Sequence, residues 1–232
     1  MTTAPTETRR PPAVAGPPLG VLAVVFTALF LGSLVLGTVL AGGSPYPSPF
    51  GETADISAYF RDHHLAVQVG GALQFAAAIP LAIYAATASA RLQHLGIRNP
   101  GATIALAGGL LAAAFLALSG LLGWVLSQEP VTADPGLTHA VQYLNFAAGG
   151  PGHVVPLGLL LAGMAVPGLL AGLLPRWLAW SGLVIAAVAE LATLSLLFEP
   201  AAFLLPIARF TGLAWLIIAG FRLPLQRPRQ TT

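Results

Sequence analysis

Six apolar runs divide the chain, and each is long enough to cross a lipid bilayer. An α-helix rises ~1.5 Å per residue, so a hydrocarbon core of ~30 Å needs roughly 20 residues. The runs cover residues 19–40, 65–90, 102–127, 139–174, 177–198 and 202–223. The pattern predicts an all-α membrane bundle of about six helices, forming one domain over residues 19–223.

Charged residues are too scarce for a water-exposed surface. They make up 8% of the 232 residues, against roughly 25% in a soluble domain, so most of the surface is expected to face lipid. The absence of cysteine excludes disulfides and thiolate metal ligands. All ten cations are arginine, and they form no basic stripe, so we expect the lipid bilayer and not nucleic acid as a partner.

The arginines predict the orientation of the bundle, because basic residues are retained in cytoplasmic loops. Only Arg61 falls in a predicted external segment. The predicted cytoplasmic arginines are Arg9, Arg10, Arg91, Arg98, Arg176, Arg222, Arg227 and Arg229. Both termini are therefore expected in the cytoplasm, as a disordered tail over residues 1–18 and a short tail over residues 224–232. The composition, rich in Ala, Gly and Pro and lacking Lys, favours a high-GC bacterium and hence its inner (plasma) membrane.

The first run is interpreted as an uncleaved membrane helix. It exceeds the ~7–15 residue core of a signal peptide, although a cleavage site near residues 39–41 stays open. The proline-rich stretch over residues 44–49 predicts an extended external loop. A short helix beginning at Thr53 places Ile56, Tyr59 and Phe60 on one face. This amphipathic segment is expected on the outer membrane surface, with a lid over the bundle as an alternative that is compatible with it.

Two charges fall deep inside the predicted spans, where each costs at least ~2.5–3.5 kcal/mol on insertion scales. Glu190 lies ten residues before Pro200 and Arg209 nine residues after it. In an antiparallel hairpin both lie ~14 Å from the turn, so we expect a buried Glu190–Arg209 ion pair. The pair has two interpretations, a ligand, anion or proton site and a structural clasp between two helices.

The fourth run is expected to be a broken helix. The sequence Gly149-Gly150-Pro151-Gly152-His153 combines a missing backbone donor with free glycine backbone, so it predicts either a simple kink or a substrate site. Polar residues gather near the break and in the second span: Gln74, His139, Gln142, Asn145 and His153. The fourteen-residue spacing of His139 and His153 resembles paired haem ligands. No second helix carries a partner pair, so no cofactor or metal is expected.

From about residue 70 onward, over roughly two thirds of its length, the chain resembles an uncharacterised family of multi-pass membrane proteins common in high-GC bacteria. The resemblance rests on Gly71-Ala72-Leu73-Gln74-Phe75, Pro80-Leu81-Ala82-Ile83-Tyr84-Ala85, Gly149-Gly150-Pro151-Gly152-His153-Val154-Val155-Pro156, Leu174-Pro175-Arg176 and the region of Glu190 and Arg209. It implies the membrane topology and no reaction, cofactor or catalytic residue.

The leading functional hypothesis is binding or transport of a small polar or anionic molecule in the outer half of the bundle. The expected ligand-binding residues are Gln74, Asn145, His153, Glu190 and Arg209. Arg209 would attract the anionic group, Glu190 would balance the charge or exchange a proton, and His153 would donate from the break. The alternative is a non-catalytic membrane subunit or sensor with a structural Glu190–Arg209 pair. The chain carries none of the nucleophile, phosphate-binding or zinc motifs of enzymes. Neither ligand nor oligomeric state is predicted.

Overall fold

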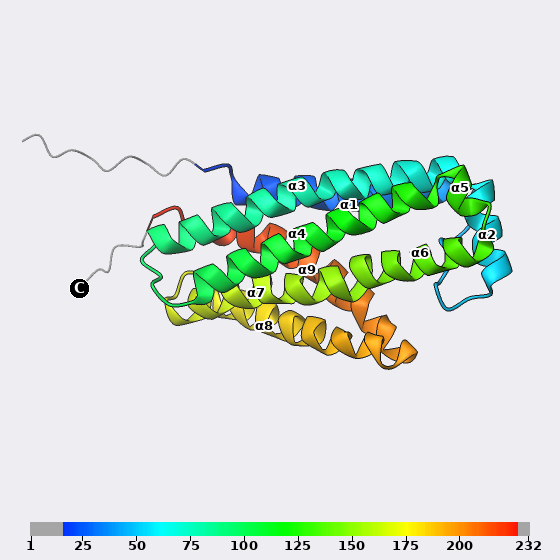
Figure 1. Cartoon of the computed structure of the whole chain (residues 1–232). Helices are drawn as coiled ribbons and strands as arrows, with labels where there is room; N and C mark the ends of the chain where they lie inside the picture. The colour runs from blue at the N-terminus through cyan, green and yellow to red at the C-terminus, as the bar shows by residue number, and fades with distance from the viewer. Residues whose placement is uncertain (1–15, 227–232) are drawn as a thin grey trace, which may run out of the picture.

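The computed structural model describes residues 16–226, and this part of the chain contains helices and no strand. The predicted tails lie mostly outside the described residues. The helices, labelled in Figure 1, are α1 (Leu19–Leu40), α2 (Thr53–Asp62), α3 (His64–His94), α4 (Gly101–Leu126), α5 (Glu129–Thr132), α6 (Pro135–Ala147), η1 (Ala148–Gly152), α7 (His153–Leu170), α8 (Arg176–Leu191), η2 (Ala192–Leu196), η3 (Glu199–Phe203) and α9 (Leu204–Arg222).

Six helical segments are long and apolar enough to span a membrane, which confirms the predicted all-α multi-pass bundle. Three are the single helices α1, α3 and α4. The other three are composite, and they join α6 through α7, α8 to η2, and η3 to α9. Each boundary lies within about four residues of its predicted position, because a bilayer fixes span length more tightly than it fixes helix rotation.

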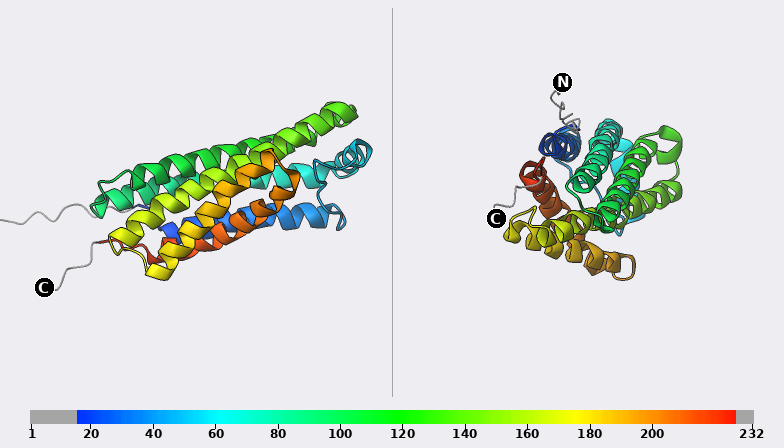
Figure 2. Two further views of the ribbon diagram at one scale, coloured as in Figure 1. Left: turned by 90° about the horizontal axis from the view of Figure 1, so that it is seen from below. Right: turned by 90° about the vertical axis from the view of Figure 1, so that its left-hand side faces the viewer.

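The two ends of the described chain lie at the same end of the bundle (Figures 1 and 2). There α1 crosses α9 so closely that a Cβ on Gly220 would lie 2.8 Å from the backbone nitrogen of Gly20. We call this end, which carries Arg91, Arg176 and Arg222, the arginine end, and the opposite end the α2 end. The arginine end is the one expected in the cytoplasm.

The helices pack through small residues. A Cβ on Gly120 of α4 would lie 2.6 Å from the Phe75 nitrogen of α3, and one on Gly163 of α7 would lie 2.4 Å from the Ala105 nitrogen of α4. Lipid tails are as apolar as leucine, so contact between helices depends on close backbone approach and van der Waals packing. Glycine permits that approach, and α4 is consequently held between α3 and α7.

The predicted break in the fourth span is confirmed. Gly150 has φ −81° and ψ −108°, outside the helical region, and the five residues of η1 form a wide turn between α6 and α7. Pro151 supplies no backbone N–H, so the hydrogen-bond ladder is interrupted at this point. Backbone carbonyls are therefore free near the middle of the span, facing other helices and not lipid.

Helix α2 lies across the α2 end of the bundle (Figure 1). Its apolar residues Ile56 and Phe60 are buried against Val67, Leu126 and Val141 of α3, α4 and α6. Helix α2 therefore covers this end of the bundle as a lid, and its placement on the outer membrane surface, which is compatible with this, stays a prediction. The turn between α8 and α9 stops short of this end of the bundle, so it leaves the outer part of α1 without α9 as a neighbour.

Candidate functional site

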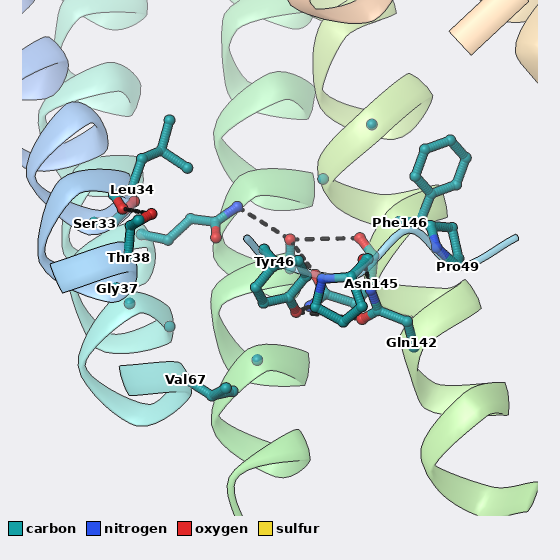
Figure 3. A pocket seen from close by; sticks show the side chains of 18 of the residues that line it. Ser33, Leu34, Gly37, Thr38, Tyr46, Pro49, Val67, Gln142, Asn145 and Phe146 are labelled. Carbon is teal, nitrogen blue, oxygen red and sulfur yellow. Dashed lines mark hydrogen bonds between the residues drawn. The ribbon is translucent and has the colours of Figure 1, made fainter. Parts of the chain in front are cut away.

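A cavity of about 370 Å³ lies in the half of the bundle nearest the α2 end. Its walls come from α1, α3, α4, α6, η1 and the start of α9, and the loop before α2 covers it. Figure 3 shows Ser33, Leu34 and Thr38 of α1 on one side and Tyr46, Asn145 and Phe146 on the other. Most lining atoms are apolar, and a small set of polar groups converges on one side. This combination is typical of small-molecule sites.

The polar groups form one directed chain of hydrogen bonds. Gln74 Nε2 donates to Ser119 Oγ at 3.1 Å, and Ser119 Oγ donates to Asn145 Oδ1 at 2.5 Å. Asn145 Nδ2 donates to the Tyr46 hydroxyl at 2.9 Å, and that hydroxyl donates to Gln142 Oε1 at 3.2 Å. The chain links α3, α4, α6 and the covering loop, so it orients the amides before any ligand arrives.

Arg209 carries the one formal charge among the described residues that line the cavity. Its guanidinium donates from Nη2 to the free carbonyl of Gly149 in η1 and lies 5.4 Å from the centre of the Phe30 ring. Nε is buried without a hydrogen-bond partner in the described structure. The one ion pair over residues 16–226 joins Arg61 to Asp62, so no described carboxylate oxygen lies within 4 Å of the Arg209 side-chain nitrogens. The cavity therefore holds a cation without a counter-charge.

The cavity ends toward the middle of the bundle. Phe26 and Phe30 of α1 are each 1% exposed, and Leu213 and Leu216 of α9 are buried beside them in the main core. Arg209 lies thirteen residues before Arg222, hence ~20 Å along α9 from the arginine end. The site consequently opens only in the half of the bundle nearest the α2 end.

The loop before α2 is fastened over the cavity by α6. Gln142 Nε2 donates to the Pro47 carbonyl at 3.0 Å, and His139 Nε2 donates to the Pro49 carbonyl at 2.8 Å. The other ring nitrogen of His139 accepts from Thr53 Oγ1 at 2.7 Å. The Tyr46 phenol is protonated at neutral pH, and its hydroxyl accepts from Asn145 and donates to Gln142. We call residues 44–50 the strap.

Tyr46→Phe is expected to loosen the strap. The change removes one donor and leaves the Asn145 and Gln142 amides short of a partner, which costs about 1 kcal/mol. The chain has no cysteine, so a single Ser33→Cys reports on the cavity. Adding Tyr46→Phe should make the reaction of the Ser33→Cys thiol with a charged thiosulfonate about fivefold faster. The reaction rate of Ser89→Cys, which is buried outside the cavity, should not change when Tyr46→Phe is added. An equal increase at both cysteines would mean global loosening instead.

The expected Glu190–Arg209 ion pair does not form in the described structure. Helix α8 buries Gly182, Ala186 and Ala189 against α7 and α9, and Glu190, one residue further, is exposed. The two residues do lie on the same hairpin, but distance from the turn fixes depth and not helix rotation. Glu190 therefore lies outside the cavity. It neither clasps α8 to α9 through Arg209 nor lies where it could exchange a proton with Arg209.

A double-mutant cycle checks this correction. Glu190→Gln should change the free energy of unfolding in detergent by about 0.5 kcal/mol or less, because the carboxylate is exposed and unpaired in the described structure. The coupling energy between Glu190→Gln and Arg209→Gln should also be below about 0.5 kcal/mol. A coupling of several kcal/mol would restore the ion pair and remove the uncompensated cation.

His153 does not reach the cavity lining either. It is fully buried, and its Nδ1 donates to the Ala112 carbonyl of α4 at 2.9 Å. Its ring meets that of Phe26 edge-on at 6.5 Å, and its Nε2 has no partner in the described structure. We expected His153 to donate into the site from the break. The wide turn at Gly150 resets the helical phase, so His153 ties the start of α7 to α4.

The structure thus brings together Gln74, Asn145 and Arg209, and it leaves out Glu190 and His153. Sequence reasoning missed Tyr46 and Ser119 as members of the site. A serine inside an apolar span is a signal that could have pointed to Ser119, since polar groups in lipid need partners. Nothing local in the proline-rich loop marks Tyr46, because its partners lie 96 and 99 residues away.

Comparisons with protein-family models, with curated proteins and with solved structures find no match. The resemblance to a bacterial membrane family therefore stays a prediction. Among the described residues no three His, Asp or Glu side chains gather as a metal site. The polar chemistry that the cavity offers consists of the Arg209 guanidinium, the side-chain amides of Gln74, Gln142 and Asn145, and five hydroxyls, beside the face of the Phe30 ring.

Proposed function

We propose that this protein is a multi-pass protein of a bacterial inner (plasma) membrane that binds a small anionic molecule in the outer half of its bundle. The observation that carries the proposal is Arg209, a half-buried cation in a cavity whose described lining includes no acidic side chain. An unpaired charge inside a membrane domain is costly and is retained where a ligand or pathway uses it.

An oxyanion fits the donors that remain. Arginine binds carboxylate and phosphate groups through parallel N–H donors. In Arg209, Nη2 donates to the Gly149 carbonyl, and Nε is buried without a hydrogen-bond partner in the described structure. Each side-chain amide carries two N–H donors, and Gln74 and Asn145 each use one of theirs inside the chain of hydrogen bonds. The second N–H of each amide is left to contact the ligand.

The alternative, a non-catalytic subunit or sensor held by a structural Glu190–Arg209 pair, loses that pair. Transport would need a second state in which Phe26 and Phe30 move and the cavity opens to the arginine end. Because the packed core closes the cavity toward the arginine end, the described state supports ligand binding and not passage through the bundle.

The proposal is tested by titrating the detergent-purified protein with sodium methyl phosphate and, separately, with choline chloride in isothermal calorimetry. Methyl phosphate presents an oxyanion without bulk, and choline presents a cation of similar size. We expect a single site for methyl phosphate and no heat from choline. Binding of choline alone, or of neither compound, would contradict an anion site.

A further inference from the structure

The cavity opens sideways, between the outer halves of α1 and α9. Along one stripe of α1, Phe26 and Phe30 are each 1% exposed, and one turn further out Leu34 is 44% exposed although it still lines the cavity. Thr38, the next residue of the stripe, is also exposed and also lines it. The increase in exposure along this stripe shows that α9 no longer covers this face of α1 beyond Phe30.

Helix α9 gives the other edge of the opening. Leu216 and Leu213 are buried, Arg209 is half-buried, and Pro206 is exposed and lines the cavity. The helices touch near the arginine end at Gly20 and Gly220 and separate toward the α2 end (Figure 2). Both edges thus consist of exposed and mainly apolar groups within membrane spans, so what lies outside the opening is lipid.

Access from the aqueous side is more restricted. The strap covers the cavity and is held by hydrogen bonds from Gln142 and His139 and by packing of the Phe50 ring on Phe146, with ring centres 5.3 Å apart. Helix α2 is buried against the bundle beside it. A site covered on its aqueous side and open toward acyl chains suits a ligand that already resides in the membrane.

We infer that the ligand is an anionic amphiphile of the outer leaflet, with a phosphate or carboxylate head at Arg209 and an acyl chain that leaves between Leu34 and Pro206. This inference rests on the proposed function and names its ligand class. The polar chain from Gln74 to Tyr46 receives the head group, and the apolar edges of α1 and α9 contact the chain. The cavity volume of about 370 Å³ is within the range of small-molecule sites, which is sufficient for a head group without its chain.

The test compares three probes that share parts of one molecule. Oleoyl lysophosphatidic acid has the phosphate head and a chain, glycerol 3-phosphate has the head alone, and oleoyl lysophosphatidylcholine has the chain with a zwitterionic head. Protein in a neutral maltoside detergent is titrated with each lipid by native mass spectrometry and with glycerol 3-phosphate by calorimetry. We expect one lysophosphatidic acid per chain, at least about tenfold weaker binding of lysophosphatidylcholine, and detectable binding of glycerol 3-phosphate.

Variants at the opening separate the two sources of the head group. Leu34→Trp, and independently Thr38→Trp, fills the opening and should weaken lysophosphatidic acid at least about tenfold while glycerol 3-phosphate changes less than about twofold. Val35→Trp is the matched control, because Val35 is 60% exposed on the same helix and does not line the cavity. Val35→Trp should change the affinity for neither lysophosphatidic acid nor glycerol 3-phosphate.

Three outcomes would count against this inference in different ways. If glycerol 3-phosphate binds as tightly as the lipid and both tryptophan variants leave the lipid unaffected, the ligand is a free anion from the external solution, and the proposed function survives. If the two lysolipids bind with equal affinity, the opening binds an acyl chain without selecting between an anionic and a zwitterionic head group. If neither glycerol 3-phosphate nor lysophosphatidic acid binds wild type, the inference and the proposed function both fail.

Discussion

Arg209→Gln should lower the affinity of the protein for methyl phosphate about 100-fold. A charge-assisted hydrogen bond in a water-poor site contributes more than a neutral one, and removing the charged partner of a buried contact costs roughly 2–5 kcal/mol. Glutamine keeps the polarity but loses the guanidinium, its contact with Gly149 and its position over Phe30. The measurement is isothermal calorimetry on variants whose melting temperature is recorded in parallel.

Arg209→Lys is the matched control for charge. Lysine keeps the cation but loses the planar pair of donors and the contact that fixes them, so we expect an affinity between those of wild type and Arg209→Gln. Arg209→Gln should not destabilise the fold by more than about 1 kcal/mol, because no described carboxylate is left unpaired by the change. An unchanged affinity in Arg209→Gln would remove Arg209 from the site.

Gly120→Leu should be the most destabilising of the substitutions considered, at about 3 kcal/mol or more. A Cβ at this position would lie 2.6 Å from the Phe75 nitrogen and 2.7 Å from the Gly71 carbonyl, both backbone atoms of α3. Backbone cannot yield as a side-chain tip does, so α3 and α4 must separate. Unfolding in detergent measures the loss directly.

The same change also tests the link between packing and the site. Ser119 precedes Gly120 and accepts from Gln74 across the α3–α4 contact, so separation of these helices breaks the chain of hydrogen bonds at its start. Gly32→Leu on α1 is the control, because a Cβ there meets nothing within 4 Å. It should leave stability within about 1 kcal/mol, since leucine is also a better helix former than glycine. Equal losses in both variants would contradict the packing described.

The sequence was sufficient for the spans and for the break, because each has a local cause. Span length follows from bilayer thickness, and the break at Gly150 follows from proline and glycine in the fourth run. The depth of Arg209 could also be predicted by counting residues from the turn. These properties depend on distance along the chain alone.

Rotation about the helix axis could not be predicted in the same way. Glu190 lies on the expected hairpin with Arg209, but α8 turns Ala186 and Ala189 inward and leaves Glu190 exposed. Apolar residues cover α8 on all sides, so its sequence carries little information on which face is buried. The direction of the His153 side chain could not be predicted either, because the sequence does not show how the break at Gly150 rotates α7 relative to α6. Tyr46 depends on contacts between residues far apart in the chain.

The distance between the bound phosphate and the Arg209 guanidinium shows directly whether the anion lies at this site. Wild-type protein labelled with ¹⁵N-arginine and loaded with methyl phosphate is measured by ³¹P–¹⁵N rotational-echo double resonance in the solid state. An N–H···O bond of ~2.8 Å predicts a phosphorus–nitrogen separation of about 4 Å that is absent in Arg209→Lys. The absence of dephasing in wild type at saturating methyl phosphate would show that the anion binds elsewhere and that Arg209 is not its ligand.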